Sequence, residues 1–231
     1  MKKKLWAVLC TLGLVLMLPM SSAGHATNPT HGMSPWAPAG GGGLHTIGVC
    51  LDASFYGPTT WSTTDPAHLR LKEAMATWNT IYGQQSFVTA GPGGWWPTCP
   101  STNNRVIMYV KPAGTPPFTG GDTYIKGQAQ HNHSTNCAGH WLSGSNQCNI
   151  DSSIYLNDYY WWYVLTGTPP SGTYDLESGL LHELGHTLGL ADLSGCSVDA
   201  MCPLSVQQIR RTFGADDYVH VRHLYWDGTH H

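Results

Sequence analysis

The sequence predicts an α+β fold in a single domain. Short segments of alternating apolar and polar residues, bounded by Gly and Pro, indicate β-strands, and one longer segment carries the start signal and periodicity of a helix. No internal repeat divides the 231 residues. About 205 residues follow a leader segment, which is an ordinary size for one hydrophobic core.

Residues 1–26 have the three-part form of a secretory signal peptide. Three lysines are followed by an apolar run and then by small residues that end at Ala23 or Ala26. The run is too short for a membrane anchor and no second one follows, so we expect a secreted protein that is free of the membrane. Residues 27–43 are rich in Pro, Gly and His and predict a flexible lead-in to a domain at 44–231.

The first half of the domain contains one predicted helix among strands. Asp65 is a favourable N-cap, Pro66 suits the first helical position, and apolar residues recur at helical spacing to residue 82. The predicted strands span 44–54, 86–90 and 105–110.

The middle of the chain carries weaker signals. Residues 120–149 contain few apolar side chains and are predicted to form a loop. A short strand is predicted after it, at Ile154, Tyr155, Leu156 and Asn157.

The most informative motif is His182-Glu183-Leu184-Gly185-His186. Two histidines four positions apart lie on one face of a helix, so both imidazoles can bind one metal ion while Glu183 points to the open side of the metal. The pattern with Gly189 added arises by chance in about one chain in a thousand of this composition. The alternative is a surface helix that carries the two histidines by coincidence.

Asp192 is the predicted third metal ligand. Gly189 can adopt the left-handed conformation that ends a helix sharply, which lets the chain return Asp192 to the metal. No glutamate follows Glu183 in the chain, so a later glutamate ligand is excluded. Asp216 or Asp217 is the alternative third ligand. Three protein ligands and an open position are typical of one catalytic Zn²⁺.

At these residues the chain resembles the metzincin metalloproteases, whose pattern is H-E-x-x-H-x-x-G-x-x-H or D followed by a methionine turn. Met201 within 199–203 matches that Met-turn. The segments 176–190 and 205–225 are similar to the active-site helix and C-terminal segment of the matrixin branch. Matrixins normally have histidine where Asp192 stands, whereas the snapalysin-type secreted bacterial proteases have aspartate.

The resemblance implies a twisted mixed sheet with two long helices above a zinc cleft, and a small lower subdomain with a C-terminal helix. It also implies a monomeric secreted zinc endopeptidase that acts on protein or peptide substrates. Zn²⁺ would activate a water, and Glu183 would take its proton as general base. Ile154 to Asn157 matches the edge strand that pairs with extended substrate. A non-enzymatic aromatic-rich binding module with a zinc site, or a zinc hydrolase of non-peptide amides, are the alternatives.

Cysteine content agrees with an oxidising compartment. Of the seven cysteines one, Cys10, lies in the leader, which leaves an even six. The sequence does not fix their pairing. Closeness along the chain favours Cys137 with Cys148 and Cys196 with Cys202, which leaves Cys50 with Cys99.

Other residues have competing interpretations. Loop histidines at 131, 133 and 140 could form a second, structural metal site with Asp122, although solvated histidines are the simpler interpretation. The aromatic run 159–163 is either a binding platform or packing with wet polar edges. His220 and His223 on the last predicted helix are interpreted as structural. The formal charge of −3 and the lack of a basic patch exclude a nucleic-acid partner.

Overall fold

The computed structural model describes residues 47–52, 65–82, 87–89, 105–111, 115–118, 127–134 and 148–225. The predicted leader and lead-in therefore lie outside the described residues. The described chain is an α+β fold with a five-stranded mixed sheet, a two-stranded sheet and three helices. In chain order the elements are β1 (Ile47–Leu51), α1 (Pro66–Tyr82), β2 (Phe87–Thr89), β3 (Arg105–Lys111), β4 (Gly127–Ser134), β5 (Cys148–Asn157), β6 (Trp162–Tyr163), β7 (Tyr174–Asp175), α2 (Leu176–Thr187) and α3 (Ala215–Tyr225).

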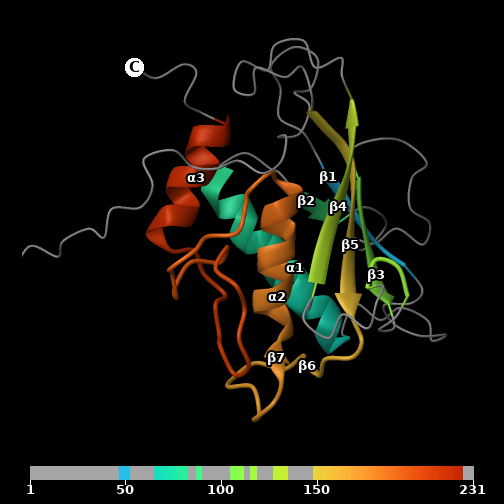
Figure 1. The fold of residues 1–231 in the computed structure, drawn as a ribbon, viewed down its shortest axis with the longest axis vertical. Helices are drawn as coiled ribbons and strands as arrows, with labels where there is room; N and C mark the ends of the chain where they lie inside the picture. Colours follow the sequence, from blue (N-terminus) through green and yellow to red (C-terminus); the bar gives the residue numbers. More distant parts are fainter. Residues whose placement is uncertain are drawn as a thin grey trace, which may run out of the picture.

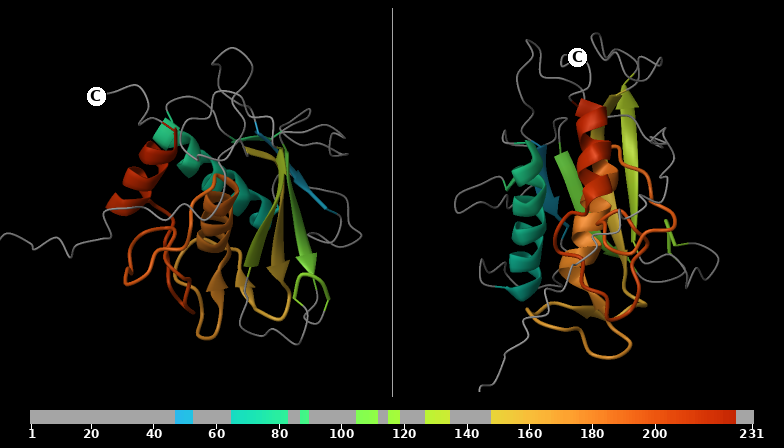
Figure 2. Two further views of the ribbon diagram at one scale, coloured as in Figure 1. Left: turned by 45° about the horizontal axis from the view of Figure 1, so that its top comes forward. Right: turned by 90° about the vertical axis from the view of Figure 1, so that its left-hand side faces the viewer.

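The main sheet has the order β2-β1-β3-β5-β4, in which β4 alone runs antiparallel to its neighbour. Helices α1 and α2 pack side by side on one face of this sheet (Figures 1 and 2). Side chains alternate across a strand, so every second residue of β3 and β5 points to the helices. These residues are buried: Val106, Met108, Ile154 and Leu156.

The helix predicted at the first cap signal is confirmed as α1. The Asp65 carboxylate accepts the Ala67 N–H at 2.9 Å, as an N-cap does. The buried face of α1 includes Leu71 and Trp78, and the Trp78 indole donates to the Leu181 carbonyl of α2 at 2.7 Å. This bond fixes how the two helices face one another at the middle of α2.

The strands predicted at 44–54, 86–90 and 105–110 correspond to β1, β2 and β3, with ends shifted by a few residues. The loop predicted at 120–149 is wrong in two places, because it contains all of β4 and the start of β5. Strand β4 has the polar sequence GQAQHNHS. It lies at the sheet edge and buries Ala129 toward the core, so it needs few apolar residues to pair.

The predicted edge strand is also wrong. Ile154, Tyr155, Leu156 and Asn157 do form a strand, as the C-terminal part of β5. However, β5 pairs with β3 on one side and with β4 on the other, so its backbone has no free edge there. Among the described strands, the edge on this side of the sheet is β4.

A buried cluster of charges anchors the start of α2. Glu177 accepts from Arg70 of α1 at 2.9 Å and lies 3.2 Å from Arg211 Nε. Burial and a hydrogen bond with Glu73 raise the pKa of Glu177 to about 7, against the opposing effect of Arg211 and Arg70. The cluster joins α1, α2 and the segment before α3 by charge as well as by apolar packing.

Helix α2 starts at an N-cap residue, Asp175. Asp175 accepts the Ser178 N–H at 3.0 Å, and the helix ends at Thr187, three residues before the predicted end. The last helix, α3, falls within the predicted C-terminal segment. No helix in the described ranges is long and apolar enough to cross a membrane.

Candidate metal centre

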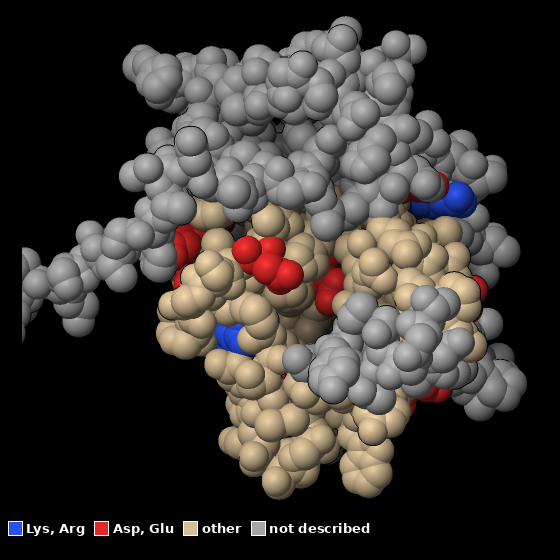
Figure 3. All heavy atoms as spheres, viewed as in Figure 1, with Lys and Arg blue, Asp and Glu red and all other residues tan. Residues whose placement is uncertain are grey.

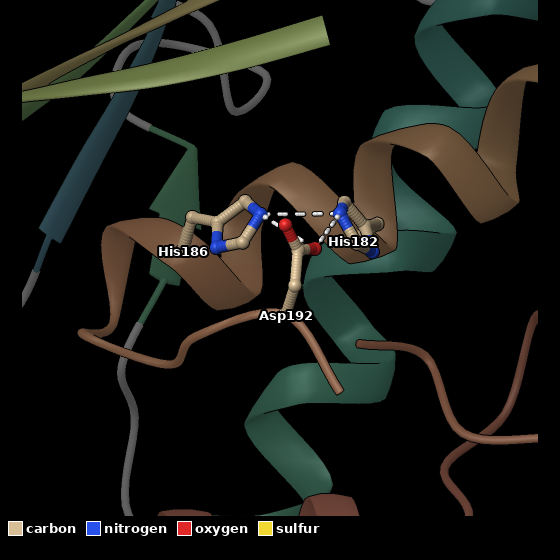
Figure 4. A group of neighbouring side chains, drawn as sticks. All are labelled: His182, His186 and Asp192. Atoms are coloured by element: carbon tan, nitrogen blue, oxygen red, sulfur yellow. Dashed lines mark hydrogen bonds and ion pairs between the residues drawn. The ribbon is translucent and has the colours of Figure 1, made fainter. Parts of the chain in front are cut away.

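Three predicted ligands meet at one point beside α2. His182 and His186 project from the same face of the helix, and Asp192 approaches from the segment that follows it (Figure 4). The two Nε2 atoms lie 3.1 Å apart. Asp192 Oδ1 lies 3.1 Å from His182 Nε2 and 3.5 Å from His186 Nε2.

The backbone after α2 explains how Asp192 reaches the histidines. Gly189 has a φ of 95°, which is the left-handed conformation predicted for it. Its N–H donates to the His186 carbonyl at 2.8 Å, and the Leu190 N–H reaches back to the Gly185 carbonyl at 3.1 Å. The chain therefore reverses within one helical turn and places Asp192 beside the two imidazoles.

Hydrogen bonds to backbone carbonyls indicate which nitrogen of each imidazole carries the proton. His182 Nδ1 lies 2.9 Å from the Ala200 carbonyl, and His186 Nδ1 lies 2.8 Å from the Leu190 carbonyl. A carbonyl oxygen only accepts, so each Nδ1 carries the proton. In the neutral imidazoles both Nε2 atoms then present lone pairs, next to a carboxylate oxygen. Three acceptor atoms this close together repel one another unless a positive charge lies between them.

The spacing of these atoms fits a tetrahedral zinc ion. Ligand bonds of about 2.0–2.2 Å at tetrahedral angles place neighbouring ligand atoms about 3.3–3.6 Å apart. The three observed separations, 3.1, 3.1 and 3.5 Å, lie close to that range. The Asp192 side chain is 62% exposed, so the centre opens toward solvent on that side.

The electrostatics of the centre agree with the geometry. Burial lowers the pKa of His186, but the hydrogen bond with Asp192 and the charge of Glu183 outweigh it and raise this pKa to about 9. Hydrogen bonds from His182 and His186 hold the pKa of Asp192 well below its usual range. The group therefore favours a bound cation, whether a proton or a metal ion.

Glu183 is a buried carboxylate beside this group. Burial raises its pKa, while the charges of His182 and His186 oppose that shift. Its Oε2 atom has no hydrogen-bond partner within the described part of the chain. The other oxygen faces Gly127 at the start of β4, where the Cβ of any other residue would come within 2.3 Å of Oε1. An ionisable group in this setting has the features of a general base.

Met201 packs against α2 at Gly185. It is buried, and a Cβ on Gly185 would stand 2.2 Å from its sulfur and 2.8 Å from Trp78 Cζ2. Glycine at position 185 is therefore required by the close approach of the Met-turn. The carbonyl of the preceding residue, Ala200, is the acceptor that orients His182.

The alternative third ligands do not join the group of ligand atoms. Asp217 is fully buried and accepts backbone N–H groups of Ala200 at 2.6 Å, Gly214 at 2.9 Å and Met201 at 3.1 Å. Its oxygens are thus taken by backbone N–H groups of the Met-turn and of Gly214. Asp217 is a supporting residue that sequence reasoning missed, because only the fold brings α3 to residues 200 and 201.

A disulfide and a buried arginine hold the loop around Met201. Cys196 and Cys202 are bonded to each other, which confirms the predicted pairing and excludes both thiolates as metal ligands. The Arg210 guanidinium donates to the carbonyls of Asp199, Cys202 and Pro203. Cys50 is also disulfide-bonded. Cys99 and Cys137 lie outside the described residues, as does the side chain of Cys148, so their pairings stay predictions.

The remaining predicted residues fall into two groups. His131 and His133 lie on β4, which corrects the predicted loop, but their side chains and all of His140 and Asp122 lie outside the described residues. The aromatic run divides: Trp162 packs against Gly179 of α2, whereas Tyr159 and Trp161 are 57% and 76% exposed. His220 is half-buried, and the side chain of His223 is not among those described.

Figure 3 shows the face seen in Figure 1. Its described surface is mostly uncharged, and acidic side chains gather near its centre beside a hollow. No protein-family model matches the chain, and none of the curated proteins compared with it matches.

Proposed function

We propose that this protein is a secreted zinc-dependent endopeptidase of the metzincin type. The observation that carries the proposal is the convergence of His182 Nε2, His186 Nε2 and Asp192 Oδ1 at tetrahedral spacing, next to the buried carboxylate of Glu183. A structural zinc site has four protein ligands, whereas the three ligands found among the described residues and the exposed side of Asp192 leave a position for water. When bound, zinc would supply Lewis acidity toward a water and a carbonyl oxygen.

Glu183 is proposed to move the proton in this reaction. Its carboxylate takes a proton from the attacking water and gives it to the leaving amine. Burial suits this role, because it raises the pKa of the carboxyl above its ordinary value and so makes the carboxylate a stronger base. The Oε2 atom is buried and has no hydrogen-bond partner in the described ranges, and we assign to it the hydrogen bond to the attacking water once zinc and water are bound.

The substrate is proposed to bind along β4. This strand replaces residues 154–157 of β5, which the sequence predicted as the substrate-binding edge. Among the described strands β4 pairs only with β5, so its other side presents backbone donors and acceptors to an extended peptide. Gly127, at the start of β4, touches Glu183. A peptide added to this edge would therefore pass beside the base and the metal ligands.

The metzincin assignment is further supported by Met201 beneath α2 and by the left-handed Gly189. Secretion is supported by the leader pattern and by the disulfide between Cys196 and Cys202, since such bonds persist in oxidising compartments.

Digestion by the purified mature protein tests the proposal. Casein and a peptide library are incubated with the protein as isolated, after chelation, and after zinc is restored. We expect about one zinc per chain, cleavage of peptide bonds, loss on chelation and recovery with zinc. Cleavage that survives complete metal removal would contradict the proposal, and so would hydrolysis confined to non-peptide amides.

A further inference from the structure

We infer that Gly127 is a positioning residue for Glu183: the missing side chain at the start of β4 leaves the space that the carboxyl group of the base occupies. The inference rests on the proposed function, because it assigns a role to Gly127 in that reaction. It concerns a residue on the sheet edge, far in sequence from the motif that contains the base.

The contact between Gly127 and Glu183 is closer than any side chain at position 127 would allow. A Cβ there would lie 2.3 Å from Oε1, 2.8 Å from Cδ and 3.0 Å from Cγ of Glu183. Ordinary van der Waals contact begins at 3.4 Å. The whole carboxyl group of Glu183 would therefore have to retreat by about 1 Å, a displacement that can cost a catalytic group about a hundredfold in rate.

The backbone gives no other reason for glycine at this position. The φ angle of Gly127 is not in the left-handed region, and Gly127 pairs with Leu156 as an ordinary strand residue. Any L-residue can adopt that conformation, and alanine is favoured over glycine in a strand because glycine loses more backbone freedom on folding. The three atoms nearest to a Cβ at this position all belong to Glu183, so space for this side chain is the reason that the structure gives for glycine.

The two sides of this contact differ in how easily they can move, so a side chain at position 127 should affect the position of Glu183 more than the stability of the fold. The groups that a new Cβ meets belong to the end of a flexible side chain, which can rotate away, whereas β4 is held to β5 by its ladder of hydrogen bonds. The fold can therefore accommodate alanine at little cost in stability. The reaction cannot, because the displaced carboxylate no longer meets the water that it must deprotonate.

The test is the Gly127→Ala variant of the zinc-loaded protein. We expect one zinc per chain, a melting temperature within about 3 °C of wild type, a kcat at least about tenfold lower and a KM changed less than about twofold. Lys72→Ala, an exposed residue of α1 outside the proposed site, is the control and should keep kcat. A crystal structure of Gly127→Ala should show the Glu183 carboxyl moved by about 1 Å.

A double-mutant cycle with Glu183→Asp isolates the contact. The shorter aspartate withdraws its carboxyl from Gly127, so in that background Gly127→Ala should lower kcat by less than about twofold. An equal loss in both backgrounds, an unmoved carboxyl, wild-type kcat or failure to fold would each overturn the inference. If the wild type cleaves no peptide, the proposed function fails, but the crystal structure still decides whether Gly127 positions Glu183.

Discussion

Replacement of Asp217 by asparagine should loosen the Met-turn and, through it, one histidine of the metal centre. The carboxylate accepts three buried backbone N–H groups, from Ala200, Met201 and Gly214. Hydrogen bonds to a charged acceptor contribute about 1.5–3 kcal/mol each. Asparagine has an NH2 group in place of one carboxylate oxygen, and this group would point its own N–H at a backbone N–H. We therefore expect a loss of about 3–5 kcal/mol in the free energy of unfolding.

For a domain of this size such a loss lowers the melting temperature by about 6–20 °C. A second effect follows from the hydrogen bond between the Ala200 carbonyl and His182 Nδ1, since a displaced Met-turn lets the imidazole rotate. Zinc affinity should then fall by about 10- to 100-fold, as it does when the partner of a ligating histidine is removed.

Thermal unfolding of the chelated protein measures the first effect, and competition with a zinc indicator measures the second. Asp216→Asn is the matched control, because it removes the same charge one residue earlier without touching the Met-turn amides. If the two variants melt within about 2 °C of each other and bind zinc equally well, the supporting role of Asp217 is refuted.

Three other changes probe the centre and its scaffold. Asp192→Ala should weaken zinc binding by at least about tenfold while Asp192→His retains it, as equilibrium dialysis would show; equal retention by wild type and the alanine variant would remove Asp192 from the ligands. Gly185→Ala should cost about 1–3 kcal/mol in urea unfolding, because Met201 and Trp78 are buried and leave no room for a methyl group; an unchanged midpoint would contradict that packing. The pKa of Glu177 is raised to about 7 from its ordinary value near 4.5. The folded protein therefore gains free energy of unfolding from protonated Glu177 at low pH, and this gain is lost as the pH rises through 7. In the metal-free protein Glu177 should therefore account for a loss of about 3 kcal/mol between about pH 5 and pH 8, so wild type should lose distinctly more stability over this range than Glu177→Gln; parallel curves would argue against the shift.

The local parts of the centre were predictable from sequence because each signal lies within one or two helical turns. The spacing of His182 and His186 is a helix period, and Gly189 and Asp192 follow directly. Asp65 and Asp175 cap their helices through neighbouring backbone groups in the same way. Such signals need no knowledge of how distant segments pack.

The rest of the site depends on contacts between distant segments. Strand β4 lacks alternating apolar residues, because an edge strand with one buried Ala129 obtains its stability from pairing with β5, so its sequence resembles a loop. The contacts of Gly127 with Glu183 and of Asp217 with Ala200 likewise form only when the sheet, α2 and α3 come together. For that reason the sequence alone points to residues 154–157 of β5 as the edge strand and to Asp217 as an alternative metal ligand.

The central claim is that Glu183 acts as a base beside a zinc ion held by His182, His186 and Asp192. The most direct measurement is the zinc content and peptidase rate of Glu183→Gln, determined on one preparation beside wild type. Glutamine keeps the shape of the side chain and leaves the three ligands intact, so we predict one zinc per chain and a rate lower by at least about a hundredfold. A zinc-replete Glu183→Gln protein that cleaves peptides at the wild-type rate would contradict the account.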